Sequence, residues 1–161
     1  MKQLKKTIWL LLLLEIFIIF IMLVLMISIC GARIEYFLNI LSLLFILLPT
    51  VPILLLSGLG KDFIMAFKVG QKDCSLLQMK KSLEAISMVQ KLILCGIGLG
   101  ITVETISFLH KMTGLTSLGP ALSIIILSLF YGILFECMLI PLATFVQYHI
   151  INAMNIEDEE P

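Results

Sequence analysis

Long apolar runs are the feature that most constrains what this 161-residue chain can fold into. The first run covers residues 8–29 and is interrupted by only two polar side chains, Glu15 and Ser28. At 1.5 Å per residue it is long enough to cross a hydrocarbon core of about 30 Å. Charged residues make up only 14% of the chain, against roughly a quarter in soluble domains, so the sequence predicts an integral membrane protein.

Three further apolar segments follow the first one. The second, residues 36–56, contains Pro49 and Pro52, and we expect these prolines to bend it because each removes a backbone donor. The third and fourth cover residues 92–109 and 120–146. The chain is therefore predicted to be an all-α membrane protein with four transmembrane helices in a single domain, residues 1–161.

The segment between the second and third spans, residues 58–91, is rich in lysine and acidic side chains and is predicted to be aqueous. Apolar residues from Leu76 to Val89 recur within it at helical spacing, which indicates an amphipathic helix that runs on into the third span. Lysines here and at the amino terminus outnumber the basic residues of the other two connections, so both termini are predicted to be cytoplasmic, at the inner membrane. Residues 152–161 form an acidic tail.

Three carboxylates, Glu15, Glu104 and Glu136, fall inside the predicted spans. A charge at the centre of a bilayer costs at least about 2.5 kcal/mol, so each carboxylate is expected to face protein or water. Glu104 and Glu136 are interpreted as part of an ion pathway or gate, with structural hydrogen bonding as the alternative. The role of Glu15, near the predicted cytoplasmic end of its span, stays open.

Small residues share a helix face with two of these carboxylates. Gly96 and Gly100 precede Glu104 at intervals of four residues in the third span. In the fourth span, Ser128, Gly132 and Glu136 follow one another at the same interval of four residues. Glu136 is expected to matter more for ion flow than Glu104. Since small faces let helices approach closely, the three glycines are predicted to form helix-packing interfaces with further subunits.

The sequence offers little support for other classes of function. The formal net charge is +0, so no basic excess exists for binding nucleic acid. Four dispersed cysteines and two histidines indicate neither a disulfide framework nor a metal site. No phosphate-binding loop or hydrolase motif is present, and we expect neither an enzyme nor a cofactor.

The segment 118–144 contains L-G-P-A-L, then Y-G, then I-P-L-A. It resembles the last membrane helix of the flagellar stator A subunits in the MotA/TolQ/ExbB proton-channel family. Residues 99–112 are similar to the third helix of that family, and residues 59–68 to the stretch that leaves the membrane after the second. Gly132 and Pro141 match the family pattern residue for residue.

This resemblance implies an A-type subunit that uses ion motive force, expected to be that of protons, to drive rotation or other mechanical work. It implies a homopentameric ring around two single-span, MotB-like partners, each with an intramembrane aspartate. The family's pore threonine corresponds to Leu129, with Ser128 beside it. The predicted ion-pathway or gating residues are therefore Glu104, Glu136, Pro141 and Ser128.

Two other functions fit parts of the sequence. Small multidrug/proton antiporters have four helices and one glutamate in the first span, which Glu15 could supply. Few aromatic residues surround Glu15, and the long inner segment, residues 58–91, is atypical of that class. In a purely structural membrane protein, every carboxylate would be a packing contact.

Overall fold

The computed structural model describes the backbone of residues 2–69, 74–111 and 118–159. The regular elements of these residues are all helices. In chain order they are α1 (Lys2–Ile29), the 3-10 helix η1 (Ile34–Phe37), α2 (Ile40–Leu56), α3 (Gly60–Ala66), α4 (Leu76–Lys111) and α5 (Leu118–Glu159).

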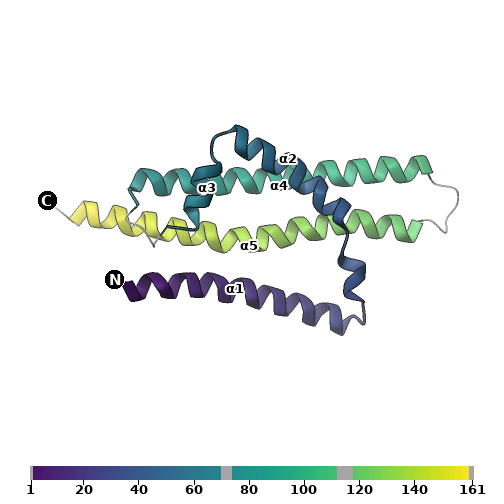
Figure 1. Cartoon of the computed structure of the whole chain (residues 1–161), viewed down its shortest axis with the longest axis horizontal. Coiled ribbons are helices and arrows are strands. Elements are labelled where there is room, and N and C mark those ends of the chain that lie inside the picture. Colours follow the sequence, from purple (N-terminus) through teal and green to yellow (C-terminus); the bar gives the residue numbers. More distant parts are fainter. Residues whose placement is uncertain (1, 70–73, 112–117, 160–161) are drawn as a thin grey trace.

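Helices α4 and α5 are the centre of the fold and lie antiparallel, side by side (Figure 1). Helix α2 crosses this pair obliquely and contacts both members, whereas α1 runs along α5 on the side away from α4 (Figure 1). The short helix α3 packs against α4. The start of α1 and the end of α5 therefore lie at the same end of the molecule (Figure 1).

Three segments are long and apolar enough to cross a membrane: Ile34–Leu56, Leu76–His110 and Leu122–Asn155. They identify the chain as a helical membrane protein. The apolar part of α1 with described side chains, Leu14–Ile29, is shorter than these three. For that reason α1 enters as a membrane span only in the functional proposal below.

The second predicted segment, residues 36–56, divides into η1 and α2. The division occurs at Asn39, whose side chain accepts a hydrogen bond of 3.0 Å from the Leu41 backbone N–H and so caps α2. Helix α2 continues through both of its prolines. It ends at Leu56, and Gly58, two residues further on, has a φ of +76°, a left-handed conformation that glycine adopts without steric cost.

The described parts of the segment predicted to be aqueous, residues 58–69 and 74–91, contain one helix that the sequence did not predict. This helix is α3, and the amphipathic helix and the third span form the single helix α4. Helix α5 likewise continues past residue 146 to Glu159, through much of the acidic tail. Ala66, Ile86 and Val146 are fully buried where α3, α4 and α5 meet, so this end has a hydrophobic core of its own.

Candidate functional site

A buried carboxyl joins the three helices α2, α4 and α5. The Ser42 hydroxyl of α2 donates to Glu104 Oε1 over 2.9 Å, and the Ser128 hydroxyl of α5 lies 2.9 Å from Oε2 and 3.0 Å from Oε1. Glu104 of α4 is 8% exposed, and both serines are fully buried. The Glu104 carboxyl group thus joins Ser42, 62 residues away in the sequence, and Ser128, 24 residues away.

Glycines make room for this contact on α4. A Cβ atom at Gly100, one turn before Glu104, would lie 3.4 Å from both Ser128 Oγ and Phe45 Cβ. At Gly96, one further turn away, a Cβ atom would lie 3.0 Å from the Ile46 Cα atom. The small face of α4 is therefore covered by α2 and α5 of the same chain, and these two glycines need no second copy to bury them.

The electrostatic environment of Glu104 consists of neutral groups. A buried carboxylate is stabilised by hydroxyl donors, and such charge-assisted bonds are stronger than neutral ones. The Ile124 carbonyl oxygen lies 3.4 Å from Ser42 Oγ, a longer and weaker contact than the bond to Glu104. A second acceptor for the Ser42 hydroxyl is therefore within reach.

Glu136 belongs to a different contact. Its Oε2 accepts a hydrogen bond of 2.9 Å from Gln90 Nε2, and the pair is only partly buried. Gln90 precedes Glu104 by fourteen residues on α4, which corresponds to about 21 Å along the helix. Exposed Lys91 is the next residue, so Glu136 lies near the polar end of α4, well separated from Glu104.

The other predicted residues lie along α5. Gly132 is buried, and a Cβ atom there would overlap the Ile97 side chain of α4. Pro141 lies inside α5 and is partly buried; its ring nitrogen leaves the Cys137 carbonyl without a helical partner. On α1, Glu15 is exposed.

Two residues of the site were missed by the sequence reasoning. Ser42 is a polar residue within the apolar segment that precedes Pro49, and this exception was the available signal. Tyr131 fixes the entry to α2, because its hydroxyl donates to the Phe37 carbonyl and accepts a hydrogen bond of 2.9 Å from the Asn39 backbone N–H. Sequence spacing carries no sign of this contact, which joins residues more than ninety positions apart.

No family model, curated protein or solved structure matches the chain. A functional proposal therefore depends on the geometry and on the sequence resemblance.

Proposed function

We propose that the chain is the A-type subunit of an ion-driven membrane complex. In this proposal α1 is a fourth span, both termini are cytoplasmic, and five copies surround single-span partners that each carry an intramembrane aspartate. The complex uses ion motive force, expected to be that of protons, to do mechanical work at the inner membrane.

The length of the α4–α5 pair is the observation that carries the proposal. The helices contain 36 and 42 residues, or about 54 and 63 Å, whereas a hydrocarbon core is about 30 Å thick. Exposed Lys80, Lys81 and Lys91 lie on the first part of α4, which indicates that the excess length is in water on the cytoplasmic side.

Packing between the two helices continues through this aqueous part. Ile86 and Val146 are fully buried, and Val89 is 5% exposed. Two close-packed helices move as one unit because interiors are dense and resist compression. A displacement at the membrane end would therefore reach the aqueous end, as mechanical work requires. A small antiporter needs no such extension.

Glu104 provides a contact at the membrane end that depends on protonation. As a carboxylate it accepts hydrogen bonds from both Ser42 and Ser128. As an acid it becomes a donor, and Ser128 Oγ is the acceptor nearest Oε2; the Ser42 hydroxyl can then keep Oε1 or turn to the Ile124 carbonyl. Exchange of one proton thus changes the hydrogen bonds that join α2, α4 and α5. Pro141 then gives α5 a position where it can bend.

Contacts between copies need a surface other than the glycines buried within the chain. Cys95, Gly98 and Thr102 are exposed on α4 at intervals of three and four residues, so they share one face. A Cβ atom at Gly98 would have no other atom within 4 Å. We assign the contact with a neighbouring copy or partner helix to this exposed small face.

Native mass spectrometry of the complex, purified from its own cells in mild detergent, tests the proposal. We expect five copies of the 18.1-kDa chain together with a smaller single-span polypeptide that has an intramembrane aspartate. A monomer or dimer without a second polypeptide would contradict the proposal and favour a purely structural role for Glu104.

A substitution locates the contact between copies. Gly98→Leu places a bulky side chain on the exposed small face and is expected to dissociate the complex. Ser107→Leu is the matched control, because Ser107 is also exposed on α4 but lies about 180° around the helix. Equal complex yields for the two variants would refute this assignment.

A further inference from the structure

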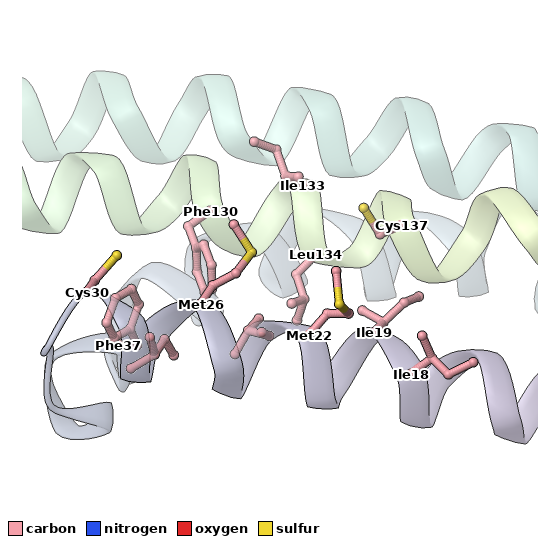
Figure 2. A pocket seen from close by; sticks show the side chains of 12 residues that line it. Ile18, Ile19, Met22, Met26, Cys30, Phe37, Phe130, Ile133, Leu134 and Cys137 are labelled. Atoms are coloured by element: carbon pink, nitrogen blue, oxygen red, sulfur yellow. The ribbon is translucent and has the colours of Figure 1, made fainter.

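An apolar groove of about 600 Å³ lies between α1 and α5. Figure 2 shows side chains from the two helices facing each other across it. Its walls include Ile19, Met22 and Met26 of α1 and Phe130, Leu134 and Cys137 of α5. The groove is partly open and its walls are apolar, so in a membrane lipid or another apolar group would cover them.

The lining of the groove identifies the chemistry of its occupant. All twelve lining residues are aliphatic, aromatic or sulfur-containing, and apolar cavities do not hold water. A partner helix about 10 Å wide is the alternative occupant, and the labelling and disulfide outcomes below distinguish it from lipid. A single hydrocarbon chain is narrow enough to enter.

The length of the groove matches one leaflet of a bilayer. Its wall on α1 extends from Ile18 to Cys30, which corresponds to about 18 Å of helix. Half of a hydrocarbon core is about 15 Å. One acyl chain of a lipid in the leaflet nearer Cys30 would therefore occupy the groove along its length.

Arg33 is a cation in the connection at the Cys30 end of the groove, the end at which a lipid headgroup would lie. Cys30 and Phe37 both line this end, and Arg33 lies between them in the connection from α1 to η1. Arg33 is the only arginine of the chain, and its side chain is exposed. A guanidinium group binds phosphate oxygens in pairs. Glu35 is exposed in the same connection, so this end offers one phosphate contact and not a broad basic patch.

We propose that the α1–α5 groove binds one acyl chain of a phospholipid whose phosphate contacts Arg33. The inference goes beyond the function proposed above and rests on one part of it, that α1 is a membrane span, but not on ion-driven work or on the number of copies. Bound lipid would fill the space between α1 and the rest of the bundle.

Native mass spectrometry with added palmitoyl-oleoyl-phosphatidylglycerol tests this site on the full chain. Cys137→Trp fills the groove and is expected to lower the occupancy of one lipid per chain about tenfold, a change of about 1.4 kcal/mol. Leu48→Trp is the control, because Leu48 is exposed on α2, outside the groove and away from the exposed small face of α4. Equal occupancy in the two variants would overturn the proposal.

Two further measurements show whether the bound acyl chain belongs to a phospholipid or to a free fatty acid. They also keep the proposal testable if the Trp variant misfolds. Arg33→Gln is expected to weaken phosphatidylglycerol binding about threefold and to leave palmitic acid binding unchanged; an equal effect on both ligands would contradict the phosphate contact. In the wild type, a phospholipid with a diazirine on its acyl chain should label residues 18–30 and 130–137. Uniform labelling of all the apolar helices, or a disulfide through Cys137 to another polypeptide, would exclude the lipid site.

Discussion

Ser128 of α5 donates a hydrogen bond of 2.9 Å to Glu104 of α4, and both side chains are buried. The small-residue faces of the two longest helices therefore meet each other inside one chain. Gly100 is part of the same contact, because a Cβ atom there would already lie in van der Waals contact with the Ser128 hydroxyl, 3.4 Å away. The carboxyl group is consequently a structural tie between helices α2, α4 and α5.

The energy of this tie can be measured with a double-mutant cycle. Ser128→Ala and Glu104→Gln each alter the same hydrogen bond, so their effects on the free energy of unfolding should be coupled by about 0.6–1.7 kcal/mol, the range for interhelical bonds in membranes. Titration with sodium dodecyl sulfate in mixed micelles gives the unfolding free energies. Ser123→Ala is the control, since the Ser123 hydroxyl is exposed and bonds to the Gly119 carbonyl of its own helix. If the effects of Ser128→Ala and Glu104→Gln are additive, this hydrogen bond does not contribute to the free energy of unfolding.

A second prediction concerns the closest backbone approach between α2 and α4. A Cβ atom at Gly96 would lie 3.0 Å from Ile46 Cα and 3.1 Å from its carbonyl oxygen, and backbone atoms cannot move aside as a flexible side chain does. Gly96→Ala should therefore lower the free energy of unfolding by about 1–3 kcal/mol.

Gly98→Ala is the matched control for that change. It lies on the same helix with nothing within 4 Å of its added Cβ atom. The higher helix propensity of alanine should leave stability unchanged or raise it by up to about 1 kcal/mol. If the two alanine variants unfold alike in mixed micelles, the close approach at Ile46 is not a stabilising contact.

A third prediction concerns Tyr131, whose hydroxyl serves two backbone groups of the connection between η1 and α2. Tyr131→Phe leaves the Asn39 N–H and the Phe37 carbonyl without this partner, at a cost of about 1–3 kcal/mol for buried groups. Hydrogen exchange at the Asn39 amide should accelerate. Tyr148→Phe, at an exposed tyrosine of the same helix, should leave that exchange rate as in the wild type. Slow exchange at Asn39 in both variants would mean that the bond does not hold the entry to α2.

Helical periodicity showed which residues share a face, but not what covers that face. The four-residue spacing placed Gly96, Gly100 and Glu104 together, and all three are buried. Helices α2 and α5 of the same chain cover them, whereas the sequence led us to expect further subunits there. A spacing pattern carries no information about the partner helix, because any close-packed neighbour satisfies it.

The sequence signals for where each helix begins and ends were weak or hidden. The cap at Asn39 involves only one side chain and one neighbouring amide, and the surrounding apolar run concealed it. Helix α3 is short, and its burial of Ala66 arises from packing against α4, which a local pattern does not reveal. The prolines of α2 were expected to bend the segment; α2 is continuous through both, and the Thr50 hydroxyl bonds to the Ile46 carbonyl over 2.6 Å.

The last prediction ranks the two glutamates in ion flow, and it rests on the proposed function. The sequence favoured Glu136, because it shares a face with Ser128. The structure changes this expectation, since Ser128 contacts Glu104, whereas Glu136 is partly buried and bonds to Gln90 near the polar end of α4. Proton exchange at Glu104 alters bonds among three helices, and exchange at Glu136 alters one bond between two.

Glu104→Gln removes the exchangeable proton but nearly preserves the shape of the side chain. In liposomes that contain the assembled complex, it is expected to reduce proton flux about tenfold, or about 1.4 kcal/mol in the barrier. Glu136→Gln keeps an oxygen that can accept from Gln90 and should change the flux less than about twofold, below about 0.4 kcal/mol. Complex abundance must be equal in all samples, so that lost assembly is not read as lost flux. Unchanged flux in the Glu104 variant, or a larger loss in the Glu136 variant, would remove Glu104 from the ion pathway and leave it as a structural tie between α2, α4 and α5.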